Sequence, residues 1–215
     1  MENKMTNFDR LSNFVIEGKI EELKELVQKE IKENIDPMDI INKGMMKGMD
    51  VVGERFKNGD MFVPEVLMSA NTMKAGMNIL RPLLTETNIK SRSLVALGTA
   101  KGDLHDIGKN LVGMILESAG LEVVDLGVDV STEVFINAVR EKKPAIIGMS
   151  ALLTTTMTSM KDVINSLKEE GIRDNVKVII GGAPITPSFA EEVGADGWAP
   201  DAVSAKDLTL QMLKR

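Results

Sequence analysis

The chain has 215 residues, 43% hydrophobic and 27% charged, which is typical of one or two folded globular domains and not of a disordered or fibrous protein. A net charge of −6 argues against nucleic acid as a partner, and the absence of cysteine excludes disulfides, iron–sulfur clusters and thiolate nucleophiles. No apolar run approaches the roughly 20 residues that span a bilayer, and the polar N-terminus does not resemble a signal peptide, so we expect a cytoplasmic protein with no membrane partner.

The first part of the chain, residues 8–87, has a helical pattern. Its apolar side chains recur at spacings of three and four, as on one face of an amphipathic helix. Asp36 and Pro37 have the residue types of a helix N-cap and first turn. The four predicted helices contain residues 11–15, 20–31, 36–52 and 64–80. Four helices joined by short loops predict an antiparallel bundle.

The second part alternates strands and helices. Short apolar runs rich in β-branched residues predict strands at 94–98, 122–126, 145–150, 176–180 and 197–199. Helical stretches are expected near 106–119, 131–142, 157–170 and 186–193 and from about 201. This alternation predicts a doubly wound, Rossmann-like (flavodoxin-like) parallel sheet. The polar segment 85–93 would be the linker, which divides the chain into domains 1–88 and 89–215.

In such a sheet, ligands bind in the loops beyond the carboxyl ends of the strands. The loop after the first predicted strand contains Asp103, His105 and Gly108, a D-x-H-x-x-G motif. A carboxylate two residues from a histidine can hold one ring nitrogen and leave the other free to coordinate a metal. The motif alone also fits a capped turn, with Asp103 or Asp106 as the N-cap and a solvated histidine.

His105 is the only histidine of the chain. A zinc or iron site built from side chains needs three or four ligands, and only carboxylates remain to complete one here. A macrocycle that supplies its own equatorial nitrogens needs a single axial nitrogen from the protein. One histidine is sufficient for that kind of cofactor.

The same motif resembles the fingerprint of B12-binding domains, which hold a corrinoid with its own benzimidazole base displaced by a protein histidine. Further similarity lies at Ser150-x-Leu152, at Gly181-Gly182 and at residues 194–201. The resemblance implies that His105 is the lower cobalt ligand. It also implies that Asp103 and Thr156 complete its hydrogen-bonded set, in which the related methionine synthase has serine in place of threonine. The remaining cofactor-binding residues implied are Asp106, Gly108, Ser150, Leu152, Thr154, Gly181, Gly182 and Gly197.

Residues 52–66 resemble the four-helix module that precedes the B12 domain in methyl-transfer proteins and covers the upper face of the corrin. Phe62, Val63 and Leu67 are the expected contacts with the cofactor on this side, although ordinary bundle packing explains these apolar residues equally well. The linker 85–93 would then be the hinge that moves the helical domain aside for partner enzymes.

The whole chain looks like a corrinoid protein of the methanogen and acetogen methyltransferase systems that use methylamines or quaternary amines such as glycine betaine. Such a protein accepts a methyl group on Co(I) from a substrate-specific methyltransferase. It then passes the group from methyl-Co(III) to a second methyltransferase acting on coenzyme M or tetrahydrofolate. A reductive activase would be a further partner, and little catalysis is expected from the chain alone.

Three alternatives remain open at this point. One is the B12-binding subunit of an adenosylcobalamin-dependent mutase, and another is a cobalamin sensor. The preceding helical bundle argues against the mutase subunit, and the short segment after the last predicted strand argues against a sensor with an output domain. The third alternative is a flavodoxin-like binding module without a corrinoid.

Overall fold

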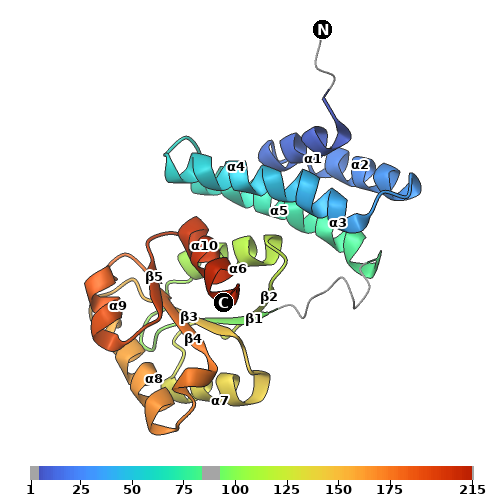
Figure 1. Ribbon diagram of the computed structural model, residues 1–215. Coiled ribbons are helices and arrows are strands. Elements are labelled where there is room, and N and C mark those ends of the chain that lie inside the picture. Colours follow the sequence, from blue (N-terminus) through green and yellow to red (C-terminus); the bar gives the residue numbers. More distant parts are fainter. Residues whose placement is uncertain (1–4, 84–92, 215) are drawn as a thin grey trace. The chain divides into compact units, whose positions relative to one another are not determined.

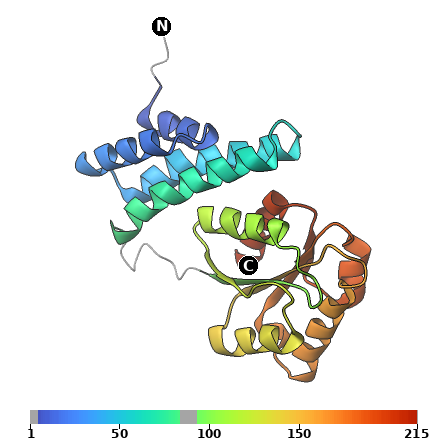
Figure 2. The ribbon, with the colours of Figure 1, turned by 180° about the vertical axis from the view of Figure 1, so that it is seen from behind.

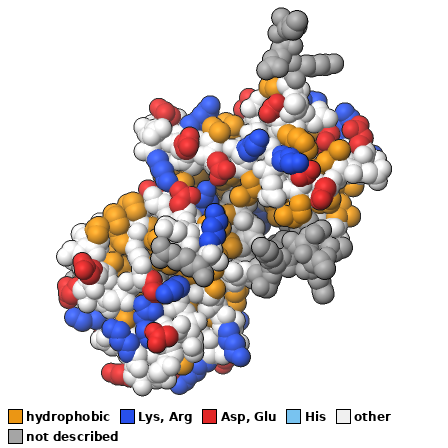
Figure 3. All heavy atoms as spheres, viewed as in Figure 1, with side chains coloured by type: hydrophobic (Ala, Val, Ile, Leu, Met, Phe, Trp, Pro, Cys, Tyr) orange, Lys and Arg blue, Asp and Glu red, His pale blue; other side chains and the backbone are white. Residues whose placement is uncertain are grey.

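The computed structural model describes residues 5–83 and 93–214 (Figure 1). The chain forms two compact units, Met1–Ser91 and Arg92–Arg215, each of which is described by itself. The expected domain boundary between residues 88 and 89 and most of the expected linker lie outside the described residues. None of the helices described is both long and apolar enough to cross a membrane. Acidic and basic side chains are interspersed on the face seen in Figure 3.

The first unit is helical, as the sequence predicts. The third predicted helix is a continuous run whose middle turns are a π-helix, which the sequence did not predict. Side chains cap three of the helix starts: Thr6 and Asp9 form a capping box, Asp36 accepts a bond from the Met38 N–H, and Glu65 accepts one from the Phe62 N–H. The elements are α1 (Asn7–Ile16), α2 (Ile20–Lys32), α3 (Pro37–Asp39), the π-helix η1 (Ile40–Met45), α4 (Met46–Lys57), α5 (Val63–Leu80) and the 3₁₀ turn η2 (Arg81–Leu83).

Glycines allow two of these helices to pack closely. A Cβ added to Gly44 would lie 2.9 Å from Leu11 Cδ1, and one added to Gly48 would lie 2.6 Å from the carbonyl oxygen of Ser12. Both glycines face α1, so the contact of α1 with η1 and α4 depends on the absence of a side chain at these positions.

The second unit is an open sheet of five parallel strands in the order β2-β1-β3-β4-β5. This order is that of flavodoxin-like doubly wound folds, so the predicted fold class is confirmed. A 3₁₀ turn at Arg173–Asn175 is an addition to the expected elements. The elements are β1 (Leu94–Thr99), α6 (Ile107–Ser118), β2 (Glu122–Asp125), α7 (Thr132–Lys142), β3 (Ile146–Ser150), α8 (Thr158–Glu169), η3 (Arg173–Asn175), β4 (Lys177–Gly181), α9 (Pro187–Val193), β5 (Gly197–Ala199) and α10 (Ala202–Leu213).

Helices cover both faces of the sheet (Figure 2). On one face α7, α8 and α9 bury a core that includes Phe135, Ile147 and Ile164. On the other face α6 and α10 pack over Val95, Ile146 and neighbouring sheet residues. Strands buried on both faces explain why β1, β3 and β4 are continuous apolar runs in the sequence and do not alternate.

The strand register places the loops after β1, β3 and β4 beside one another. Thr99 at the end of β1 pairs with Ser150 at the end of β3, and Ser150 pairs with Gly181 at the end of β4. The loops that follow these three strands therefore leave the sheet at the same level of its carboxyl edge.

Candidate functional site

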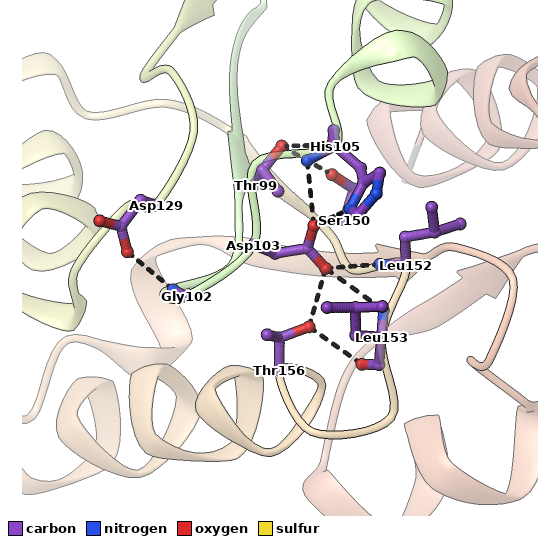
Figure 4. Close-up of polar contacts among 9 residues, drawn as sticks. All are labelled: Thr99, Gly102, Asp103, His105, Asp129, Ser150, Leu152, Leu153 and Thr156. Carbon is purple, nitrogen blue, oxygen red and sulfur yellow. Dashed lines mark hydrogen bonds and ion pairs between the residues drawn. The ribbon is translucent and has the colours of Figure 1, made fainter.

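Asp103 is the centre of the polar contacts at this edge (Figure 4). Its side chain is fully buried in the loop between β1 and α6. Oδ1 accepts hydrogen bonds from the His105 backbone N–H at 3.0 Å and lies 2.7 Å from His105 Nδ1. Oδ2 accepts bonds from the Leu152 N–H at 2.7 Å and from the Thr156 hydroxyl at 2.8 Å. Two loops far apart in the sequence thus meet on one carboxylate.

The surroundings of Asp103 keep it ionised. Burial raises the pKa of this carboxyl, but the hydrogen bonds from the backbone of His105 and Leu152, from Thr156 and from the His105 ring outweigh it. The pKa therefore lies well below its ordinary value. An ionised Asp103 can only accept hydrogen bonds, so it fixes which nitrogen of the neighbouring imidazole carries the proton.

His105 presents one ring nitrogen to the outside of the protein. Its Nδ1–H donates to Asp103, which leaves the lone pair on Nε2. The His105 side chain is 54% exposed, and within the part of the chain that is described no hydrogen-bond partner occupies Nε2. This is the arrangement of a metal-binding histidine oriented by a carboxylate.

A second chain of hydrogen bonds supports the same loop. The buried hydroxyl of Thr99 lies 3.1 Å from the carbonyl oxygen of His105 and 3.1 Å from Ser150 Oγ. A carbonyl only accepts, so when Thr99 donates to it, Ser150 must donate to Thr99. Ser150 thereby joins the end of β3 to the loop that carries His105.

The glycines of the site differ in what surrounds them. A Cβ on Gly182 would lie 1.9 Å from the carbonyl oxygen of Ala151, and one on Gly181 would lie 2.8 Å from that of Ala199, so the protein's own backbone requires both glycines. On Gly197 it would meet Leu208 and Met212 of α10. On Gly108, in the first turn of α6, it would meet nothing within 4 Å. Of these four glycines, only Gly108 borders space that residues 5–83 and 93–214 do not fill.

Exposed apolar side chains occur in the same segments as the imidazole and its partners. Leu104 and Ile107 are 71% and 78% exposed, and Leu152 and Leu153 are 44% and 43% exposed. Thr154 lies exposed in the same loop as the last two. Two of these four aliphatic residues lie at the start of α6 and in the loop before it, and two lie in the loop after β3, so together they offer exposed apolar area suited to a large apolar ligand.

The capped-turn interpretation does not account for these contacts. Asp106 occupies the N-cap position of α6, but its side chain makes no capping bond and accepts one from Asn110 Nδ2 at 2.9 Å. No group of three or more potential metal ligands exists among the described residues, so His105 belongs to no metal site built from side chains there.

Three residues of this edge were not assigned a role from the sequence. Leu153 adds a backbone N–H, 3.3 Å from Asp103 Oδ2, and Thr99 bridges the two loops. Asp129 accepts a bond from the Gly102 N–H at 2.7 Å. The available signal was a polar residue at or shortly after the carboxyl end of a predicted strand, directly after it for Thr99 and three residues beyond it for Asp129. It does not say which loop such a residue contacts.

Comparisons with known proteins identify the family. A family model described as a B12 binding domain matches residues 93–206, and a second with the same description matches residues 8–81. A corrinoid protein of Desulfitobacterium hafniense (strain Y51) is 43% identical, with 97% of this chain and 98% of that protein covered. The dimethylamine corrinoid protein 2 of Methanosarcina acetivorans is 43% identical, with 98% and 99% covered.

Among solved structures, the methanol:cobalamin methyltransferase complex of Methanosarcina barkeri contains a similar chain. The TM-score is 0.83 at 32% identity, with all of this chain and 81% of that chain covered. Both units are included in this similarity, and it agrees with the order of a helical unit followed by a doubly wound sheet. The chain belongs to the B12-binding family of corrinoid proteins.

Proposed function

We propose that the chain binds a corrinoid at the carboxyl edge of its sheet, base-off, with His105 Nε2 as the lower ligand of the cobalt. The single observation that carries this proposal is the half-exposed imidazole, held through Nδ1 by a buried carboxylate and free at Nε2. The donor set fits the group, because a corrinoid provides four equatorial nitrogens and requires only one from the protein.

The rest of the site fits as well. The exposed side chains of Leu104, Ile107, Leu152 and Leu153 would lie against the macrocycle, and the space beside Gly108 admits a ligand close to the backbone. Ser150, Thr154 and the Gly181–Gly182 pair would hold the displaced nucleotide tail. Asp106 and Gly197 belong to the same set by resemblance to the family.

A bound corrinoid would supply the cobalt chemistry of methyl transfer. The residues of this chain position the lower ligand. Asp103 accepts from Nδ1 of His105 and so fixes the tautomer that leaves the lone pair on Nε2 for the cobalt. Thr156 donates to Asp103 and maintains its orientation.

The function that follows is that of a methyl carrier in a methylamine or quaternary-amine methyltransferase system. Support comes from a full-length relative named a dimethylamine corrinoid protein and from the solved methyltransferase complex that contains a similar chain. A substrate-specific methyltransferase would load the carrier. A second one, acting on coenzyme M or tetrahydrofolate, would unload it, and a reductive activase would restore the reduced cobalt. The chain alone would show little catalysis.

The test uses the full chain reconstituted with cobalamin. With a partner methyltransferase, a reductant and methyl-labelled dimethylamine, trimethylamine or glycine betaine, we expect the label to co-elute with the chain in gel filtration. His105→Ala should bind less corrinoid and take up less label. Label uptake by His105→Ala at the wild-type rate, with a wild-type absorption spectrum, would contradict the assignment of His105. No label on the wild-type chain with any of the three donors would contradict the methyl carrier.

A further inference from the structure

Asp129 has an unusual backbone conformation at the edge of the proposed site. It lies in the loop between β2 and α7, and its φ of 50° is in the left-handed region. Among the described residues, the others that share this feature without being glycine are Asn34 and Lys143. The conformation costs about 1 kcal/mol or more for a residue with a side chain, so contacts in the folded protein must hold it in place.

Those contacts are made to the backbone of Gly102 and Asp103. The Asp129 carboxylate accepts a hydrogen bond from the Gly102 N–H at 2.7 Å, and the Asp129 N–H donates to the carbonyl oxygen of Asp103 at 2.9 Å (Figure 4 draws the first). Gly102 is itself left-handed, with a φ of 83°. Asp129 thus holds the backbone on both sides of the Gly102–Asp103 bond.

The carboxylate and the backbone of Asp103 are therefore fixed by different loops. The 152–156 loop holds its carboxylate, and the loop containing Asp129 holds its backbone. His105 depends on both, since its own backbone N–H and its ring are each bonded to Asp103 Oδ1. A displacement of the Asp103 backbone would move the acceptor that sets the position of the imidazole.

We infer that Asp129 is a positioning residue, which fixes the Asp103–His105 pair for cobalt ligation through its bond to Gly102. The expected effect on cobalt ligation rests on the proposed function. The effect of Asp129 on the order of the loop can be measured without a corrinoid.

Substitution by glycine separates this role from a contribution to folding. Asp129→Gly removes the carboxylate and also relieves the left-handed strain, so it should retain thermal stability. Asp129→Asn keeps an acceptor oxygen and tolerates the left-handed region, so it should behave as wild type. Lys143→Gly is the matched control, because it relieves the same strain at the end of α7 without removing a contact to the 100–106 loop.

Two readouts are compared on the full chain. In the chain without corrinoid, amide hydrogen exchange in the segment 100–106 should be about tenfold faster in Asp129→Gly than in wild type, because the loop opens locally. In the chain loaded with cobalamin and reduced to Co(II), the dissociation constant should rise about fivefold, the worth of one hydrogen bond, and the electron paramagnetic resonance signal of nitrogen ligation should decrease.

The inference is overturned if Asp129→Gly matches wild type in both exchange and affinity, or if Lys143→Gly shows the same losses. Loss of thermal stability in Asp129→Gly, with the same losses in Asp129→Asn, would also overturn it, because the residue would then serve folding alone. Failure of the proposed function is distinguishable, since wild type would then bind no corrinoid, whatever the exchange rates show.

Discussion

Thr156 illustrates how one side chain serves two contacts of the site. Its hydroxyl donates to the buried carboxylate of Asp103, as the family resemblance implies for a serine or a threonine. Its additional methyl group lies beside Gly102, where a Cβ would be 3.4 Å away. This distance is an ordinary van der Waals contact, so the threonine methyl group fits beside position 102, and the left-handed φ of 83° is what favours glycine there.

Gly108 provides a test of the space assigned to the cofactor. Gly108→Ala adds a Cβ in the first turn of α6 that meets no atom of the described residues within 4 Å. We expect the free energy of unfolding to rise by up to about 1 kcal/mol, because alanine favours the helix, while corrinoid affinity falls. Urea unfolding and a cobalamin titration measure the two effects.

The control for this substitution is Gly113→Ala on the same helix. Its Cβ would make ordinary contacts with Leu97 and Val123, away from His105, so affinity should remain that of wild type. Equal affinities for Gly108→Ala, Gly113→Ala and wild type would show that the cofactor does not approach α6 at Gly108.

Asp196 predicts a pH dependence of stability. Burial raises its pKa, but hydrogen bonds from the Val178 N–H, Lys177 and Arg173 lower it more, so the pKa in the folded chain lies below the ordinary value. The unfolded chain then binds the proton first as pH falls. The stabilisation is present above the ordinary aspartate pKa of about 4 and is lost as pH falls through the folded value.

Asp196→Asn should therefore lower the free energy of unfolding by about 2 kcal/mol at pH 7, and its difference from wild type should narrow at pH 3. Denaturant unfolding at the two pH values is the measurement. Glu192→Gln, which removes an exposed ion pair with Lys161, should cost less than about 1 kcal/mol. A deficit in Asp196→Asn that is the same at both pH values would refute the electrostatic explanation.

At the scale of elements, the contact of α1 with η1 and α4 depends on the glycines that face it. Gly48→Ala would place a Cβ 2.6 Å from the Ser12 carbonyl oxygen, and backbone atoms cannot yield as a side chain does. We expect a loss of about 1–3 kcal/mol from overpacking, although helix propensity alone favours alanine by about 1 kcal/mol.

Thermal and urea unfolding measure this loss. Lys47→Ala, on the exposed side of the same helix, should change stability by less than about 0.5 kcal/mol. If Gly48→Ala were more stable than wild type, the close packing of α1 against α4 described above would be wrong.

The sequence predicts most of these elements, because their apolar patterns are strong. Each strand lies within one residue of its predicted bounds. The π-helix Ile40–Met45 could not be predicted, since its buried residues Ile40, Ile41 and Met45 also fit an α-helical spacing. Only the packed structure shows which turn the backbone adopts.

The site also contains features that the sequence predicts and features that it does not. A motif within one loop, such as Asp103 and His105, is visible in the sequence. The contact of Asp129 with Gly102 joins two loops and depends on two left-handed residues, which no spacing rule indicates. The sequence also could not explain why residues 181 and 182 are glycines, because glycine is expected both beside a close backbone segment and beside a bound ligand. The structure shows that backbone atoms of Ala199 and Ala151 lie close to these two positions.

For the whole molecule, the proposed roles of the chain and of its partner enzymes depend on the functional groups that the chain offers. The described residues offer one exposed, oriented imidazole and no cluster of other metal ligands. Under the proposed function, selection of the methyl donor and of the acceptor would belong to partner enzymes. The central claim is that this imidazole becomes the lower ligand of a corrinoid cobalt.

The single histidine makes that claim directly measurable. The full chain is produced with ¹⁵N-labelled histidine, loaded with unlabelled cobalamin and reduced to Co(II), and its electron paramagnetic resonance spectrum is recorded. Ligation by His105 predicts that the axial-nitrogen splitting changes from the triplet of ¹⁴N to the doublet of ¹⁵N. A triplet that persists in the labelled protein would show that the corrinoid's own base remains bound, and would contradict the account.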